Sequence, residues 1–421
     1  MKVGILGSGG REHSICESLL NSKKIKKIYC FPGNAGTSSI AENVNISLDD
    51  FEGIEKFVLS NKIDFVIVGP EQPLVDGIVD YLEKSQIQVF GPNKIASQLE
   101  GSKIFTKNIC KKYKIPTADF GFFELKSEAI DFLKKCNFPI VVKADGLAAG
   151  KGVYICENEQ VAIKAITEIF DGKFKNNTKV LIEEYLVGEE MSFFIISDGL
   201  TYKKFGTAQD HKRVLEGDKG KNTGGMGAYS PSRLDNSNLD YKIQKKIINP
   251  TLEALKELKT SFKGFLYAGL MIINDEPFLI EYNVRMGDPE CQTILPKLKT
   301  DFGLIIEACM KQNLDDINLD WHDDKSLCIV LCSKGYPDDY KKDIQINNLD
   351  KLNLKEKEYI FHAGTIVKNK KIYSNGGRVL NIIIQSDEFK KCRIRAIELI
   401  KKINWENGFY RKDIGFKVID S

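Results

Sequence analysis

The stretch KVGILGSGGREHSICESLL, residues 2–20, holds a short apolar run, a glycine-rich loop and an amphipathic segment in succession. Val3–Leu6 has the composition of a buried strand, and Glu12–Leu20 spaces its apolar residues as a helix does. The same alternation continues with strand-like runs at 27–31 and 65–68 and helix-like runs at 51–59 and 75–82. Strands that alternate with helices predict a doubly wound parallel sheet over the first hundred residues.

Glycine- and proline-rich segments follow these predicted strands. They are GSGGREH (7–13), PGNAG (32–36) and GPEQPL (69–74). Ligands of an open parallel sheet bind beyond the carboxyl ends of its strands. The loops therefore predict a binding edge, and the alternative is that they are ordinary turns.

The first of these loops does not complete a dinucleotide-binding fingerprint. Glu12 stands where the third glycine would be and is expected to obstruct close packing of helix on strand. The second strand is followed by Asn34 rather than by an acid for a ribose hydroxyl of NAD. Both features argue against a nicotinamide-dependent oxidoreductase. Free amides of Gly9 and Gly10 at a helix N-terminus, beside Arg11, suit a single phosphate better.

Composition narrows the class of protein further. The chain has 421 residues, a net charge of +3 and 42% hydrophobic residues, which predicts a globular protein of two to four domains. The near-neutral charge does not favour a nucleic acid partner, and no apolar run approaches the length of a membrane span. The ten cysteines form no CxxC pair, and the four histidines are dispersed, so no familiar zinc spacing exists. We expect a cytoplasmic protein, and nothing in the sequence demands more than a monomer.

A second region begins at Ser102, where a lysine-rich helix is predicted over 103–113. A small α+β unit follows, in which DGLAAGKG (145–152) joins the predicted strands Ile140–Lys143 and Val153–Cys156. This loop is not a Walker A motif, because it lacks GK[ST] and precedes a strand. It can instead lie over phosphates, with charge from Lys143 and Lys151. The alternative is an ordinary hairpin.

Later segments add further polar groups. Glu281, Asn283 and Arg285 alternate along a predicted strand, so they share one side of it. A carboxylate beside an amide oxygen suits Mg²⁺, although a surface ladder of ion pairs is the alternative. The strand end at 183–186 could hold an adenine, and the long glycine-rich loop at 209–231 is either functional or a disordered insertion.

Ten motifs occur in an order that resembles the phosphoribosylamine–glycine ligase (glycinamide ribonucleotide synthetase) family of the ATP-grasp superfamily. They are GSGGREH (7–13), GPEQPLVDGIVD (69–80), LEGSK (99–103), KADGLAAGKGV (143–153), EEYLVGEEMSFF (183–194), QDHKR (209–213), NTGGMGAYSP (222–231), GDPECQ (287–292), FHAGT (361–365) and NGGRVL (375–380). Met286 and Lys221 depart from the family's usual Phe and Pro, and the predicted strand Phe265–Ile273 lacks the second metal-binding acid of many ATP-grasp enzymes.

The resemblance implies an α/β and α+β multidomain chain with an ATP-grasp fold. A Rossmann-like N-terminal domain is expected over 1–101 and the ATP-grasp core over 102–322, with a small lid at about 115–187. A C-terminal domain that closes the site is expected over 323–421.

The implied reaction is ATP-dependent ligation of glycine to 5-phosphoribosylamine in purine (IMP) biosynthesis. It would give glycinamide ribonucleotide, ADP and phosphate through a glycyl phosphate, with Mg²⁺ or Mn²⁺ as the metal. The nearest alternative is another ATP-grasp carboxylate–amine ligase, such as a dipeptide ligase, or a purine-pathway carboxylase. A non-catalytic nucleotide sensor is disfavoured, because the charged residues of the motifs are all present.

The resemblance also implies roles for individual residues. Arg285, Lys143 and Asp210 are expected to act in catalysis, with Asp210 and Arg285 on glycine's ammonium and carboxylate. Nucleotide contacts are expected from Lys103, Lys143, Gly150, Lys151, Gly152, Glu183, Glu184, Tyr185, Leu186 and Glu190. Metal ligation is expected from Glu281 and Asn283, and substrate contacts from Gly9, Gly10, Arg11, Glu71, Asp210 and Arg285.

Overall fold

The computed structural model describes residues 1–147, 152–174 and 179–420. Its N-terminal sheet has the order β3(Glu42–Asn43)-β2(Lys27–Pro32)-β1(Lys2–Gly7)-β4(Phe65–Val68)-β5(Gln88–Phe90), and the paired strands run parallel. The sheet packs with helices α1(Gly10–Leu20), α2(Phe51–Asn61), α3(Glu71–Asp76) and α4(Ile78–Glu83). The predicted doubly wound sheet is confirmed. The helix predicted over 75–82 is interrupted at Gly77, whose φ of +97° ends α3.

Contrary to the prediction, Glu12 does not obstruct the packing of α1 on the sheet. Gly7 and Gly69 leave space for its side chain at the ends of β1 and β4. A Cβ atom on either glycine would lie 2.5 or 2.1 Å from side-chain atoms of Glu12. The two glycines therefore accommodate the buried carboxylate at the start of α1.

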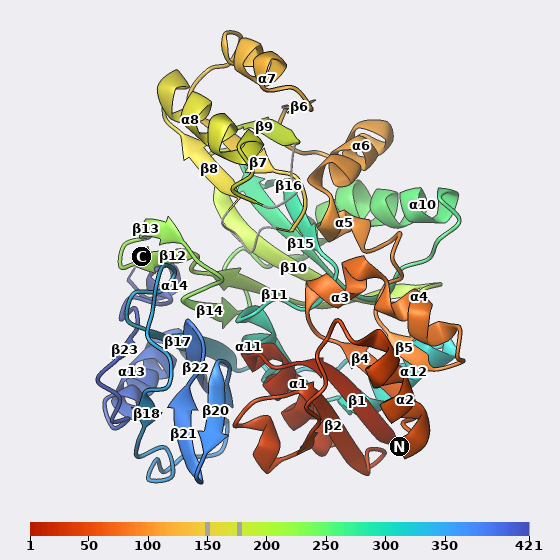
Figure 1. Ribbon diagram of the computed structural model, residues 1–421, viewed down its shortest axis with the longest axis vertical. Helices are drawn as coiled ribbons and strands as arrows, with labels where there is room; N and C mark the ends of the chain where they lie inside the picture. Colours follow the sequence, from red (N-terminus) through yellow and green to blue (C-terminus); the bar gives the residue numbers. More distant parts are fainter. Residues whose placement is uncertain (148–151, 175–178, 421) are drawn as a thin grey trace.

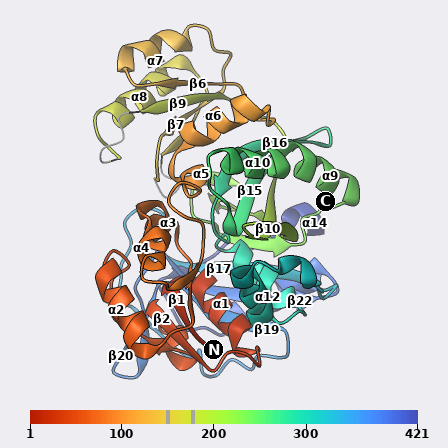
Figure 2. The same cartoon turned by 90° about the vertical axis from the view of Figure 1, so that its right-hand side faces the viewer.

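A small antiparallel sheet lies apart from the rest of the chain, at the top of Figures 1 and 2. Its order is β6(Phe120–Phe123)-β9(Val180–Glu184)-β7(Ile140–Ala144)-β8(Val153–Cys156), and α7(Lys126–Leu133) and α8(Glu159–Phe170) pack with it. Residues such as Val142, Ile166 and Val180 form an apolar core separate from the others. Helices α5(Gln98–Gly101) and α6(Lys103–Tyr113) precede this unit. We call it the lid.

A larger sheet forms the centre of the molecule. Its order is β16(Glu276–Asn283)-β15(Lys263–Ile273)-β10(Glu189–Asp198)-β11(Tyr202–Asp210)-β14(Gly227–Ser230)-β17(Lys325–Ser333)-β22(Arg378–Ser386)-β19(Glu358–His362), and β23(Gly408–Phe409) pairs with β17. Antiparallel pairing of β14 with β17 carries the sheet from the predicted core into the predicted C-terminal domain. The sheet thus passes the predicted boundary at 322/323 without a break.

The remaining elements surround this sheet. They are β12(Arg213–Leu215), β13(Lys219–Asn222), α9(Ser237–Ile243), α10(Asn249–Glu257), α11(Glu290–Ile294), α12(Phe302–Lys311), β18(Gln345–Ile346), β20(Thr365–Lys368), β21(Lys371–Ser374), α13(Phe389–Ile400) and α14(Phe416–Ile419). No helix of the described residues is long and apolar enough to cross a membrane. Cys328 and Cys332 are buried on β17, and the cysteines are free thiols.

Two buried histidines lie where the N-terminal and central regions meet the C-terminal region. His13 on α1 accepts a hydrogen bond from the backbone N–H of His362 on β19, at 2.8 Å. Burial, with His362 nearby, lowers the pKa of His13 to about 3. His211 accepts one from the N–H of Gly415, at 3.1 Å, and burial with a nearby Arg411 lowers its pKa to about 4.

The lowered pKa values of these two histidines predict that acid destabilises the folded state. Their folded-state pKa values lie below the unfolded value of about 6.5, so the unfolded chain binds protons that the folded chain does not. Their contribution to stability is complete above about pH 6.5 and is lost as the pH falls towards 4, by up to about 1.4 kcal/mol per pH unit for each histidine. We expect denaturant titrations between pH 7.5 and 4.5 to show a smaller loss of unfolding free energy in His211→Gln than in the wild type. His322→Gln, away from these contacts, is the control, and equal slopes in all three proteins would contradict the prediction.

Candidate active site

A cavity of about 870 Å³ lies between the carboxyl edge of the N-terminal sheet, the lid and the central sheet. Predicted site residues that line it are Gly9, Arg11, Glu71, Lys103, Lys143, Gly152, Glu183, Glu184, Tyr185, Leu186, Glu190, Asp210, Glu281, Asn283 and Arg285. Gly10 packs instead against Asn381 and Gln292, whose amide nitrogens lie 2.2 and 2.6 Å from the position of a Cβ. Gly150 and Lys151 lie outside the described residues.

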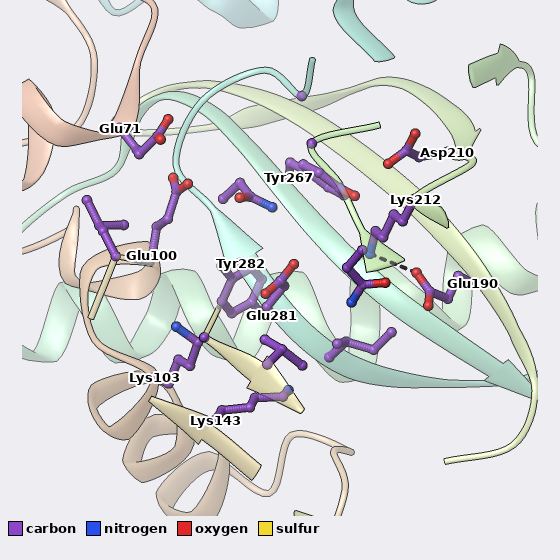
Figure 3. Close-up of a pocket in the computed structure, with 18 of the residues that line it drawn as sticks. Glu71, Glu100, Lys103, Lys143, Glu190, Asp210, Lys212, Tyr267, Glu281 and Tyr282 are labelled. Atoms are coloured by element: carbon purple, nitrogen blue, oxygen red, sulfur yellow. Dashed lines mark hydrogen bonds and ion pairs between the residues drawn. The ribbon is translucent and has the colours of Figure 1, made fainter. Parts of the chain in front are cut away.

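Figure 3 shows how the charged side chains divide the cavity. Glu71 and Glu100 lie at one end, and Asp210, Lys212 and Glu190 gather at the other. Lys103 and Lys143 lie along the edge formed by α6 and the lid, and Glu281 lies between the two ends. The cavity therefore has a cationic side that faces acidic groups on the central sheet.

A buried ion triad anchors the lysine from the lid. Glu183, on β9, pairs through one carboxylate oxygen with Lys143 of β7 and through the other with Lys107 of α6. Burial alone would raise the pKa of Glu183, but the two ammonium groups hold it below its ordinary value. The Glu183 carboxylate is therefore committed to the two lysines, and in the lid sheet Glu183 stands opposite Phe120 of β6 and Val141 of β7. Lys103 donates a hydrogen bond to the Gly146 carbonyl at 2.8 Å.

The strand end predicted to hold an adenine opens towards solvent. Glu184, which ends β9, and Tyr185, which follows it, are exposed, and Glu190 at the start of β10 lines the same cavity. The Lys212 ammonium lies 2.7 Å from the Glu190 carboxylate and lowers its pKa. Lys212 follows Asp210 and His211 in the QDHKR motif, so this motif brings a cation to the Glu190 carboxylate.

Two oxygen donors on β16 have no partner among the described residues. The side chains of Glu281 and Asn283 form no hydrogen bond or ion pair within that part of the chain, and both line the cavity. Gly269 stands opposite Glu281 on β15, and Tyr267 stands opposite Asn283. No group of three or more His, Cys, Asp or Glu residues could hold a metal in the described chain. Two protein oxygens fit Mg²⁺, which commonly takes its other ligands from phosphate and water.

Arg285 is shared by two carboxylates. Its Nε lies 3.2 Å from Glu71, and an Nη atom lies 2.7 Å from Glu100, which also accepts the backbone N–H of Val284. Arg285 lowers the pKa of Glu71 to about 2, whereas burial raises that of Glu100 to about 7 despite Arg285. The structure thus joins the predicted residues Glu71 and Arg285 through an ion pair, and adds Glu100.

The N-terminus of α1 differs from the prediction of a free Gly9 amide. The Gly9 amide is not free, because it donates a hydrogen bond to the Glu12 carboxylate at 2.6 Å. The Arg11 amide lies 3.4 Å from Asp288, and its guanidinium donates to Glu12 at 2.5 Å and to the Met286 carbonyl at 3.2 Å. A carboxylate caps this helix, since buried amides at a helix start need acceptors.

Asp210 ends β11 with an unsatisfied oxygen. Its Oδ1 is buried and accepts no hydrogen bond from the described residues. Burial, together with the nearby Glu290 carboxylate, raises the pKa of Asp210 well above its ordinary value. Such a pair of buried acids is poised to receive a cation. Arg285 is engaged with Glu71 and Glu100 rather than with Asp210, so their joint role on glycine stays a prediction.

Gly225 shapes the wall beside Asp210 and predicts a strong effect of substitution. Its φ is +112°, and a Cβ there would lie 2.5 Å from Pro289 and 2.8 Å from the Asp210 carboxylate. We expect Gly225→Ala to lower kcat/KM by about 100-fold, because it displaces Asp210. Gly217→Ala is the matched control in the same loop, since that glycine also has positive φ but its nearest neighbour is 3.9 Å away. Steady-state kinetics and thermal unfolding of both variants check this, and equal activities would contradict it.

Several residues that line the cavity were not predicted from the sequence to have a role. They are Lys107, Glu100, Lys212, Tyr267, Asp288, Glu290, Arg378 and Lys417. One signal was available for Arg378, since it is one of few arginines and stands inside NGGRVL. Lys107 carried no signal, because nothing local distinguishes it from the other lysines of α6.

The fold and the cavity define an ATP-grasp enzyme. The biotin carboxylase of Campylobacter jejuni matches with a TM-score of 0.73 over 100% of this chain and 95% of that one, at 14% identity, which shows the fold alone. Enzymes of this class use ATP with a divalent metal.

Family models place the chain more closely. The phosphoribosylglycinamide synthetase N domain matches residues 1–100, its ATP-grasp (A) domain 101–291 and its C domain 326–417. The chain is 44% identical to the phosphoribosylamine–glycine ligase of Brucella melitensis, over 100% of this chain and 99% of that protein. It matches the crystal structure of the Thermotoga maritima enzyme of that name with a TM-score of 0.85 and 33% identity, over 99% and 100% of the two chains. The chain belongs to the phosphoribosylamine–glycine ligase family.

Proposed function

We propose that this protein ligates glycine to 5-phosphoribosylamine, with ATP, to give glycinamide ribonucleotide, ADP and phosphate in purine (IMP) biosynthesis. One observation carries the proposal beyond family membership. Among the described residues, the side-chain oxygens of Glu281 and Asn283 have no partner, and they line one cavity with Lys103 of α6, Lys143 of the lid and Arg11 of α1. A site for a metal–phosphate group therefore lies within reach of a site for a sugar phosphate.

In this proposal the nucleotide lies between the lid and the central sheet. Lys103 and Lys143 offset the charge of the ATP phosphates, and the backbone of 184–186 contacts the adenine. Glu190 accepts hydrogen bonds from the ribose hydroxyls. The Lys107–Glu183 pair keeps Lys143 aimed into the cavity, because both ion pairs of Glu183 are buried. Glu281 and Asn283 would hold Mg²⁺, or Mn²⁺, which would supply positive charge to offset that of the phosphates.

The acceptor half of the proposal uses the other end of the cavity. Arg11 binds the 5-phosphate, and Glu71 accepts hydrogen bonds from the ribose hydroxyls. Asp210 binds glycine's ammonium, and Arg285 orients its carboxylate towards the γ-phosphate. Attack by that carboxylate gives a glycyl phosphate, which the sugar amine then attacks. The amine is already a nucleophile, so no covalent protein intermediate is required.

Water must be kept from the glycyl phosphate, because hydrolysis would waste ATP. The lid has its own sheet and apolar core, so it can close as a unit over the nucleotide. We propose the domain limits 1–101, 102–322 with the lid at about 115–187, and 323–421. We also propose a cytoplasmic monomer with small-molecule substrates and without nucleic acid or membrane partners.

The test is product formation from glycine, ATP, Mg²⁺ and phosphoribosylamine generated in the assay. Mass spectrometry should find glycinamide ribonucleotide, with one ADP for each product molecule. Omission of glycine and of the amine in separate reactions provides the controls. ADP release without this product would assign the protein to another carboxylate–amine ligation, and no ATP turnover by the folded protein would reject the proposal.

A further inference from the structure

Arg378, at the start of β22, brings a cation from the C-terminal region into the cavity. Its Nη1 donates hydrogen bonds to the backbone carbonyls of Gly224 and Asp288. The same nitrogen lies 3.3 Å from the Asp288 carboxylate. The guanidinium lies against Gly224, where a Cβ atom would be 3.0 Å from its Cζ. Three segments far apart in the sequence therefore meet at one side chain.

Two of these segments connect Arg378 to other parts of the cavity. The Asp288 carboxylate accepts a hydrogen bond from Gln292 at 2.8 Å and lies 3.4 Å from the Arg11 amide at the start of α1. Gly224 precedes Gly225. Because Gly225 has no side chain, the Asp210 carboxylate can lie close to its backbone. Arg378 is thus connected to the α1 terminus through Asp288 and to Asp210 through the glycine-rich loop.

We infer that Arg378 is a positioning residue for the sugar-phosphate and amino-acid half of the site. It fixes the Gly224 and Asp288 turns relative to each other, and these turns place Asp210 and Arg11. The inference rests on the proposed function. It gives no role to Arg378 at the nucleotide half, where Lys103, Lys143 and Glu190 belong to other contacts.

The chemistry of this contact requires a guanidinium. The two backbone carbonyls and the Asp288 carboxylate all lie at one nitrogen, Nη1. A lysine ammonium does not reach that position, because a lysine side chain is one bond shorter than the path to Nη1 of an arginine. Arg378 has side-chain exposure of 22%, so a small guanidinium compound from solvent could occupy the space left by truncation. Chemical rescue therefore distinguishes positioning of the turns from general support of the fold.

The experiment compares Arg378→Ala and Arg378→Lys with the wild type in the product assay. We expect kcat/KM for phosphoribosylamine and for glycine to fall by about 100-fold in R378A, as displaced site groups commonly cause. Binding of a non-hydrolysable ATP analogue should change by less than about twofold, because its contacts are elsewhere. Addition of methylguanidine should restore part of the R378A activity, and R378K should remain impaired.

Arg395→Ala provides the matched control. Arg395 also lies in the C-terminal region and forms a two-pronged ion pair with Glu358, at 2.7 and 3.0 Å, but it does not line the described cavity. It should keep its KM values and show no rescue. Unchanged KM values in both R378A and R378K, with activity lost only in proportion to unfolded protein and no rescue, would overturn the inference. A wild-type protein that forms no glycinamide ribonucleotide would overturn the proposed function and the inference together.

Discussion

Glu281→Gln should lower kcat by about a thousandfold while the free energy of unfolding changes by less than about 1 kcal/mol. The Glu281 carboxylate has no hydrogen bond or ion pair among the described residues, so its replacement removes no contact of the fold. It would remove one of two proposed protein ligands to the metal at the phosphates. Asn283→Ala should behave similarly. Kinetics at increasing Mg²⁺ or Mn²⁺ and denaturant unfolding measure the two effects.

Glu276→Gln is the control on the same strand. Glu276 begins β16 and pairs at the surface with Lys242 and Lys246. Its replacement should leave kcat unchanged within about twofold, because exposed ion pairs contribute little. Near-wild-type turnover by E281Q at saturating metal would remove Glu281 from the proposed metal site.

Arg285→Met should damage both activity and stability. It would leave Glu71 and the buried Glu100 without their shared cation, which commonly costs about 3–5 kcal/mol for a buried pair. A carboxyl whose folded-state pKa is raised loses its stability contribution as the pH rises. The destabilisation by R285M should therefore be larger at pH 8 than at pH 5.5. Urea titrations at the two pH values check this.

The double variant Arg285→Met, Glu100→Gln separates the two effects. The neutral amide should recover part of the lost stability, because one buried charge is removed with its partner. Activity should stay at least about 100-fold low, because Arg285 is also proposed to orient the glycine carboxylate. Recovery of activity together with stability would assign Arg285 a purely structural role.

Local patterns were sufficient for most of the strands and helices. The alternation of apolar runs with amphipathic segments predicted β1, β4 and α2 with bounds close to those observed, because such periodicity depends on neighbouring residues. The same reasoning predicted the strand that carries Glu281 and Asn283, but it also placed Arg285 on that strand, whereas β16 ends at Asn283 and Arg285 lies two residues beyond it. The lid strands on either side of the glycine-rich loop were found in the same way.

Long-range electrostatics explain what local patterns missed. The pairs that join Glu183 to Lys107 and Arg285 to Glu100 connect residues that the sequence separates widely, and no periodicity indicates them. The Gly9 amide was expected to be free, but a side chain three residues away satisfies it. Continuity of the central sheet past residue 322 likewise depends on pairing between distant strands.

The pairing of β14 with β17 has a practical consequence for how the chain can be divided. A break near residue 322 would remove β17, one of the two neighbours of β14, and leave a row of unpaired amides and carbonyls at a new sheet edge. Fragments made there should associate with themselves or with each other rather than remain as two stable pieces. The described residues of the lid contribute no strand to that sheet. Grafting or replacement of parts in this protein should therefore begin with the lid. The C-terminal region should be exchanged only together with the central-sheet strands with which it pairs.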